Sequence, residues 1–324
     1  MRRRLAVTVL VAGLGALVAA ASARAYVRSH TSKDNSPLAW RGSCAYLIPD
    51  SAYTPDVSSD EVSAAIHDSV STWNSTGCSY FTLKIDPPEA GGDATMERPV
   101  GKNFIVFRRD SWCPPDPTEP CYDSSATALT TVFYIDKPGD PHNGQILDSD
   151  VELNNVDFAF TVDGTRPPGS GSKTVADIQN TLTHELGHLL GLDHTCYDGW
   201  NPCEAGGRCK ANNLACQTED DCIPLDDHGQ RIPRCSDVLS TEVTDATMFN
   251  YAQALDTSKR SLSQDDVDGI CGIYPVAQDP GSCSRVDTSG ADGCAASAGR
   301  ATPGGGLLLL LALVAALFVA RRRA

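Results

Sequence analysis

The chain has 324 residues and carries 41 Asp or Glu against 26 Lys or Arg, which gives a formal net charge of -15 at pH 7. This acidic balance excludes a protein that binds nucleic acid through a basic surface. The length is enough for one sizeable domain with an insertion, or for two small domains.

The first 25 residues have the pattern of a secretory signal peptide. Arginines at positions 2–4 precede an almost wholly apolar stretch at positions 5–21, and small residues end the segment at Ala25. We therefore expect export with cleavage after Ala25, while a retained N-terminal anchor is the alternative. Residues 26–39 form a short polar segment, which is too short for a folded inhibitory domain.

The 13 cysteines of an exported chain indicate disulfide bonds rather than free thiols. Because the number is odd, one cysteine is left over, and Cys294 is the candidate because all the others precede it. Proximity and order favour three pairings, namely Cys44 with Cys78, Cys113 with Cys121, and Cys271 with Cys283.

Residues 58–73 have the signature of an amphipathic helix. Ser58 and Glu61 form a capping-box pattern, and apolar side chains follow at helical spacing, namely Val62, Ile66, Val70 and Trp73. Strand-like segments surround this helix, at residues 44–48, 81–85, 104–107, 127–135 and 146–154. In the last of these, apolar and acidic residues alternate, so we expect a half-exposed strand at an edge of the sheet.

The second half of the chain begins with a predicted helix over residues 174–190. Residues 196–240 then contain six cysteines among Gly, Asn, Asp and Pro, with few large apolar side chains. Such a segment cannot build its own hydrophobic core, so we expect an insertion held together by disulfides. A last helix begins near Ser263, where Ser263 and Asp266 suit an N-terminal cap.

The segment HELGHLLGLDH, which runs from His184 to His194, has the spacing of metal ligands. His184 and His188 lie one helical turn apart on the same face. Gly191 permits a left-handed turn that ends the helix, after which His194 can return as a third ligand. Three neutral imidazoles leave a fourth position open, which is typical of catalytic zinc.

Glu185 lies next to the first ligand and is the predicted general base. Zinc lowers the pKa of a bound water, and Glu185 is placed to take its proton and to return it to the leaving amine. A protein that only held the metal would need no such base, so Glu185 favours an enzyme.

The extended motif, with Gly191 and His194 at fixed offsets from the helix, resembles that of the metzincin zinc proteases. Residues 245–251, DATMFNY, resemble the Met-turn of that clan, with Met248 as its methionine. Residues 262–270 resemble the opening of the last helix of the matrixin family. The similarity to matrixins covers most of residues 44–275, outside the cysteine-rich insertion.

This resemblance implies an α+β fold, with a twisted mixed sheet, an active-site helix, a Met-turn and a C-terminal helix. It implies that Met248 lies beneath the zinc ion and that an extended substrate adds as an antiparallel strand along residues 146–154. Bound calcium near acidic loops is left open. Three features depart from the family. The segment between His194 and Met248 is long, and the histidines that bind a second, structural zinc in many matrixins have no full counterpart, since only His142 lies in the appropriate region. No cysteine-switch prodomain precedes the domain, so any latency is unexplained.

The C-terminal region is divided into a linker at residues 279–303 and an apolar segment at residues 304–324, which closes with three arginines. The order of Cys294, small residues, apolar residues and arginines resembles the sorting signals of myxobacterial surface proteins. That resemblance implies removal of the segment and transfer to the bacterial cell surface or outer membrane. A retained transmembrane helix is the alternative.

The sequence therefore predicts a secreted or surface-displayed zinc endopeptidase whose catalytic domain is residues 40–278 and whose substrates are proteins or peptides. The alternative is a zinc-holding surface module whose cysteine-rich insertion, residues 196–240, engages a partner. The two hypotheses differ in whether Glu185 is needed for the biological role.

Overall fold

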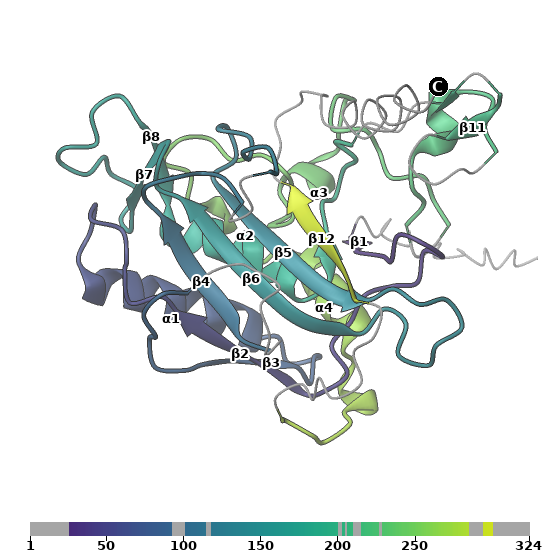
Figure 1. The fold of residues 1–324 in the computed structure, drawn as a ribbon, viewed down its shortest axis with the longest axis horizontal. Coiled ribbons are helices and arrows are strands. Elements are labelled where there is room, and N and C mark those ends of the chain that lie inside the picture. The colour runs from purple at the N-terminus through teal and green to yellow at the C-terminus, as the bar shows by residue number, and fades with distance from the viewer. Residues whose placement is uncertain are drawn as a thin grey trace, which may run out of the picture.

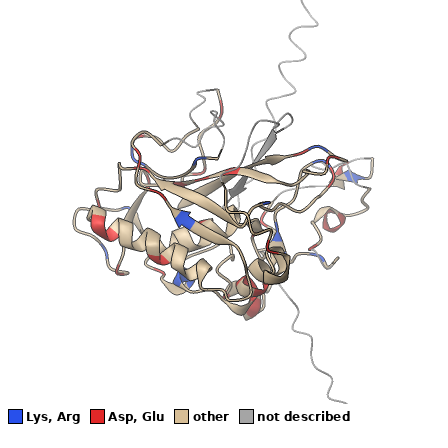
Figure 2. Cartoon of the chain, turned by 90° about the horizontal axis from the view of Figure 1, so that it is seen from below, with Lys and Arg blue, Asp and Glu red and all other residues tan. Residues whose placement is uncertain are grey.

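The structure is a computed structural model, and it describes residues 26–92, 101–114, 118–199, 203–204, 206–209, 215–226, 229–284 and 294–300. A twisted six-stranded mixed sheet packs on two helices, α1 (Ser59–Asn74) and α2 (Ile178–Leu189) (Figure 1). Seen from below, the helices form one layer beneath the strands (Figure 2). The α+β class predicted from the sequence is confirmed.

The six strands lie in the order β12-β5-β6-β4-β2-β3. Strands β3, β2, β4 and β6 run parallel, while β5 is antiparallel to β6 and β12 is antiparallel to β5. Their bounds are β2 Cys44–Pro49, β3 Thr82–Ile85, β4 Asn103–Arg108, β5 Ala128–Ile135, β6 Ile146–Asn154 and β12 Cys294–Arg300.

The prediction of an exposed edge strand at residues 146–154 is wrong. These residues form β6, which lies between β5 and β4 and is buried along its whole length. Its acidic side chains are satisfied inside the protein, because Asp150 Oδ1 accepts a hydrogen bond of 2.8 Å from Phe104 N and Glu152 pairs with Arg108. The alternating acidic side chains of this strand therefore bind partners inside the protein and do not face solvent.

Helix α1 begins as predicted. Ser58 Oγ accepts a hydrogen bond of 3.3 Å from Glu61 N, and Glu61 Oε2 accepts one of 2.9 Å from Ser58 N. Acidic residues in the first turn, Asp60 and Glu61, suit the positive end of the helix dipole. The buried face includes Trp73, whose Nε1 donates 2.8 Å to Thr183 O and so ties α1 to α2.

Helix α2 begins at Ile178, four residues after the predicted start at residue 174. Residues Thr174–Asp177 instead form strand β8, which pairs in parallel with β7 (Phe158–Thr161). Asp177 is extended and accepts a hydrogen bond of 2.9 Å from Asn180 N, so it caps the helix at this point.

The remaining elements are short, apart from helix α4. They are β1 Val27–Arg28, β9 Leu192–Asp193, β10 Cys203–Glu204, β11 Arg208–Cys209, α3 Thr241–Thr244, α4 Gln264–Ile273 and the 3-10 turns η1 Glu219–Cys222, η2 Ser258–Arg260 and η3 Val276–Gln278. Strand β1 pairs with β9, and β10 pairs with β11. Helix α4 begins after Ser263, as the sequence predicted.

Six disulfides join the twelve cysteines that precede Cys294. They are Cys44–Cys283, Cys78–Cys271, Cys113–Cys121, Cys196–Cys235, Cys203–Cys216 and Cys209–Cys222. This number of disulfides is typical of an exported protein.

The predicted pairing of Cys113 with Cys121 is confirmed, but those of Cys44 with Cys78 and of Cys271 with Cys283 are wrong, because these four cysteines exchange partners. Tyr80 N donates to Tyr274 O, which brings the end of α4 beside the segment after α1, so Cys271 meets Cys78. Ser43 N donates to Ser282 O and so aligns the neighbouring Cys44 and Cys283. The order of the cysteines along the chain does not reveal these contacts.

Among the described residues, no helix is long and apolar enough to cross a membrane. The predicted signal peptide at residues 1–25 and the C-terminal apolar segment at residues 304–324 lie outside the described residues, as does part of the predicted linker.

Candidate metal centre

Three histidines converge in the interior, as the sequence predicted. His184 and His188 come from successive turns of α2, and His194 comes from the chain directly after β9. The Nε2 atom of His194 lies 3.3 Å from that of His184 and 3.2 Å from that of His188, and all three side chains are buried. These three residues could hold one metal ion.

The spacing of the ring nitrogens fits zinc. A zinc–nitrogen bond is about 2.0–2.1 Å, and two ligands of a tetrahedral ion then lie about 3.3–3.4 Å apart. The distances of 3.2 and 3.3 Å between the Nε2 atoms match that edge length. A second cluster with ligand-type atoms, Cys203, Cys216 and Cys222, is engaged in disulfides.

Each histidine also has a partner for its other ring nitrogen. Nδ1 of His184 lies 2.6 Å from Thr247 O, and Nδ1 of His188 lies 3.0 Å from Leu192 O. Nδ1 of His194 lies 3.3 Å from a carboxylate oxygen of Asp198. Acceptors at all three Nδ1 atoms fix the tautomer that leaves the Nε2 lone pairs free to bind a metal.

Burial keeps the two helical imidazoles neutral. Desolvation lowers the pKa of His188 to about 3, and it lowers the pKa of His184 well below its ordinary value, with the nearby Lys259 charge as the next cause. A neutral imidazole is the form that binds a metal, so the site needs no deprotonation of these two side chains near pH 7.

Glu185 is buried beside the histidines and is held by the sheet. Its Oε2 atom accepts a hydrogen bond of 2.6 Å from Thr130 Oγ1 on β5. Burial raises the pKa of Glu185 to about 7, against smaller opposing effects of the Thr130 hydrogen bond and the charges of His194 and Lys259. A carboxyl group that titrates near neutrality suits the transfer of a proton at that pH.

Gly191 has the left-handed backbone that the sequence predicted, and Met248 packs against helix α2. Gly191 has φ +95°, and a Cβ atom there would lie 2.8 Å from Leu38 O, so both conformation and space require glycine. Met248 packs against Gly187 on α2, where a Cβ atom would collide with its sulfur. Methionine therefore lies against the turn of α2 between the first two ligands.

Asp266 fixes the segment that carries Met248. Its carboxylate accepts hydrogen bonds of 2.8 Å from Thr247 N and 3.1 Å from Met248 N. The same side chain accepts 2.8 Å from Ser263 N and so completes the capping box of α4. Asp266, the predicted cap residue, thus connects helix α4 to the segment that carries Met248.

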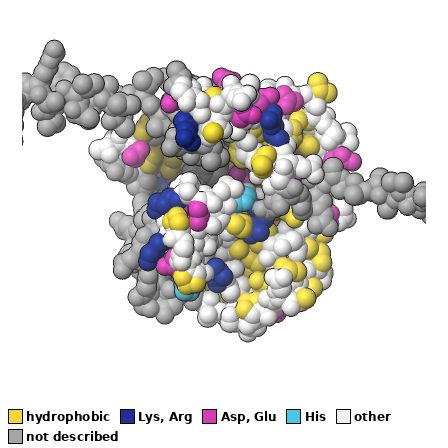
Figure 3. Space-filling view, turned by 90° about the vertical axis from the view of Figure 1, so that its right-hand side faces the viewer, with side chains coloured by type: hydrophobic (Ala, Val, Ile, Leu, Met, Phe, Trp, Pro, Cys, Tyr) yellow, Lys and Arg dark blue, Asp and Glu magenta, His cyan; other side chains and the backbone are white. Residues whose placement is uncertain are grey.

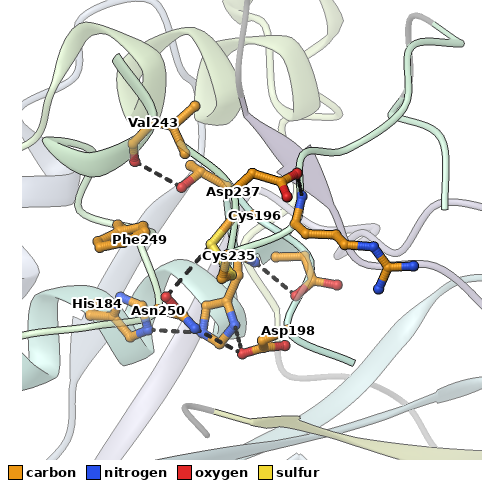
Figure 4. Close-up of a disulfide and its surroundings, with 12 residues drawn as sticks. His184, Cys196, Asp198, Cys235, Asp237, Val243, Phe249 and Asn250 are labelled. Atoms are coloured by element: carbon orange, nitrogen blue, oxygen red, sulfur yellow. Dashed lines mark hydrogen bonds and ion pairs between the residues drawn. A yellow bond between two sulfur atoms is a disulfide. The ribbon is translucent and has the colours of Figure 1, made fainter. Parts of the chain in front are cut away.

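The cysteine-rich insertion begins next to the third ligand. Asp198 Oδ2 lies between His194 Nδ1 and Asn250 Nδ2, which donates to it over 3.1 Å (Figure 4). The sulfur of Cys196, which is joined to Cys235, lies 3.6 Å from Asn250 Oδ1. Figure 4 shows Asp198 and Asn250 lying next to each other near the Cys196–Cys235 disulfide. The insertion is therefore in direct contact with His194.

A pocket opens beside the histidines, between the insertion and the N-terminal segment. Its lining includes Val132 from β5, His188, His194, Tyr197 and Ile232. Above it the insertion carries charges of both signs, with Arg231 and Arg234 at 3.1 and 3.4 Å from Asp220. Figure 3 shows acidic and basic side chains side by side at the top of this face.

The structure brings together the three histidines and Glu185 that the sequence singled out, and it places beside them three residues that the sequence did not single out. Thr130 and Asp198 are single polar residues without any motif, and only the fold brings them to the site. Lys259, whose ammonium donates to Phe249 O and lies 3.4 Å from His184 Nδ1, lies just before the last helix; burial lowers its pKa to about 8. An isolated lysine in a sequence gives no sign that it is buried.

No family model matches the chain, and no curated protein matches it.

Proposed function

We propose that the protein is an exported zinc-dependent endopeptidase of the metzincin type, similar to the matrixins. The observation that supports this most is the combination of three buried imidazoles at the ligand spacing of zinc with a buried carboxyl group, Glu185, beside them. The glycine turn at Gly191 and the methionine segment under α2 agree with the same family pattern.

The residues present suit a zinc ion. His184, His188 and His194 would hold it, and when bound it would supply a Lewis acid that activates water and polarises a peptide carbonyl. Glu185 takes the proton from the attacking water and gives it to the leaving amine. Thr130 orients this carboxylate through the 2.6 Å hydrogen bond.

A peptide substrate is expected to bind along β5 and not along β6. Strand β6 is interior, whereas β5 carries Thr130, which touches Glu185, and Val132, which lines the pocket with His188. An extended chain that adds to the outer edge of β5 would pass directly beside the histidines.

The alternative function is a surface module in which the insertion binds a partner. Its support is the exposed charged surface around Asp220, which lies on the insertion. This alternative predicts that the biological role survives the loss of Glu185, while the protease proposal predicts that it does not.

The test is cleavage of unfolded casein by the exported chain loaded with one equivalent of zinc. Glu185→Gln should keep the zinc but lower the rate by about 10²–10⁴-fold, the usual contribution of a general base. The matched control is Glu242→Gln on α3, an exposed carboxylate that should leave the rate unchanged. Equal rates for wild type and Glu185→Gln, or cleavage that persists in a chelator, would refute the proposal.

A further inference from the structure

The outer edge of β5 is occupied by a distant part of the same chain. Strand β12 pairs with it in antiparallel fashion over seven residues, from Cys294 opposite Ile135 to Arg300 opposite Leu129. In Figure 1 this strand is the yellow arrow that lies along β5. Among the described residues, β12 is therefore the last strand on this side of the sheet.

The pairing register of β12 with β5 places the backbone of β12 alongside the part of β5 that lies next to the candidate metal centre. Gly299 is opposite Thr130, the residue that donates to Glu185, and Ser297 is opposite Val132, which lines the pocket beside His188. The peptide groups around residues 297–299 thus lie along the part of β5 that contacts the catalytic groups. A second extended chain cannot use the same backbone groups of β5 while β12 holds them.

The covalent connections of the chain favour this position. The Cys44–Cys283 disulfide holds the chain at the start of β2, and the strand registers place Cys294 at the same end of the sheet. Four strand spacings of about 4.8 Å separate β2 from β12, or about 19 Å. The ten residue steps between positions 284 and 294 reach up to about 33–36 Å, so the tether spans this distance with slack.

We infer that the outer edge of β5 is a binding surface for one extended polypeptide segment and that residues 294–300 of this chain are its resident occupant. An edge strand leaves unpaired N–H and C=O groups that favour such an addition. A short tether raises the local concentration of the segment to the millimolar range, so even weak pairing keeps the edge filled. The consequence for proteolysis rests on the proposed function, because the occupied edge is where a protein substrate would bind.

Hydrogen exchange of the β5 amides tests the occupancy without any need for activity. It is measured on the full exported chain with Glu185→Gln, which prevents self-cleavage. The test variant adds Ser297→Pro and Ala298→Pro; because bonded and non-bonded pairs alternate in antiparallel strands, one of two adjacent prolines must remove a donor to β5. The matched control adds Ser297→Val and Ala298→Val, which keep both donors and favour strand structure.

The proline pair should speed exchange of the outward-facing β5 amides by at least about tenfold, while the valine pair leaves it unchanged. Equal exchange in all three proteins would overturn the inference. With Glu185 restored, the proline pair should cleave casein faster than wild type. Faster exchange without any cleavage in either protein would keep the inference and refute the proposed protease, so the two failures are distinguishable.

Discussion

The sheet and helices on one side and the cysteine-rich insertion on the other are stabilised in different ways. The sheet and helices share one large hydrophobic cluster, in which Trp73, Leu182, Leu186 and Ile105 are fully buried or nearly so. The described residues of the insertion form small clusters, one of them made of half-cystines. The metal centre lies where the two regions meet, because α2 supplies two ligands and Asp198 of the insertion contacts the third.

Removing disulfides from each region should separate their roles. Cys78→Ser with Cys271→Ser opens a long loop of the core and should lower the free energy of unfolding by about 2–5 kcal/mol. Cys196→Ser with Cys235→Ser should leave most of that free energy intact but weaken zinc binding, because the pair lies beside Asn250. Denaturant unfolding and zinc titration are the measurements. Equal losses of stability in both variants would break the distinction.

A substitution at Gly191 tests whether the close packing of the end of α2 against the N-terminal segment contributes to the free energy of unfolding. Gly191→Ala should cost about 1–3 kcal/mol of unfolding free energy, because it combines a positive φ with a close approach to Leu38 O. The control is Gly139→Ala, which has φ +83° but no atom within 4 Å of the new Cβ. A similar loss for both would mean that the backbone conformation alone, and not the contact, accounts for the effect.

Asp198 is the direct link between the insertion and the metal ligands. Asp198→Asn should lower the affinity for zinc by about 10–100-fold, the usual effect of losing the partner of a ligating histidine. Competition with a fluorescent chelator measures this without any assay of activity. Glu219→Gln, an exposed carboxylate elsewhere in the insertion, is the control. Unchanged affinity in Asp198→Asn would show that His194 is held by the core alone.

The pH dependence of stability should come from the core rather than from the exposed insertion. Burial raises the pKa of Asp148 on β6 to about 7, so the folded state keeps a proton that the unfolded chain, with its pKa near 3.8, releases. The stabilisation is therefore complete below about pH 4 and is lost as the pH rises through 7. The lowered pKa values of His184 and His188 act in the opposite direction over part of this range, so the measurement is the difference between Asp148→Asn and wild type. The unfolding free energy of Asp148→Asn, relative to wild type, should increase as the pH rises from about 4 to about 7. A difference that does not change with pH would contradict the assignment.

The sequence predicted the elements whose signals are local. The capping box at Ser58, the cap at Ser263 and the ligand spacing of the histidines each lie within a few residues, and all appear in the structure. The predictions that were wrong concern features that depend on contacts between distant parts of the chain. The acidic residues of β6 have internal partners. The Cys78–Cys271 disulfide follows from the end of α4 lying beside residues 78–80, and Cys44–Cys283 follows from the contact between Ser43 and Ser282.

The two long disulfides determine what happens when a protease cuts the chain once. Cys44–Cys283 and Cys78–Cys271 enclose almost the whole described chain. A single peptide-bond break anywhere between residues 78 and 271 leaves two fragments that remain covalently joined. Such a nicked molecule keeps the mass of the intact chain, to within one water molecule, until it is reduced, so non-reducing gels would hide damage that reducing gels reveal.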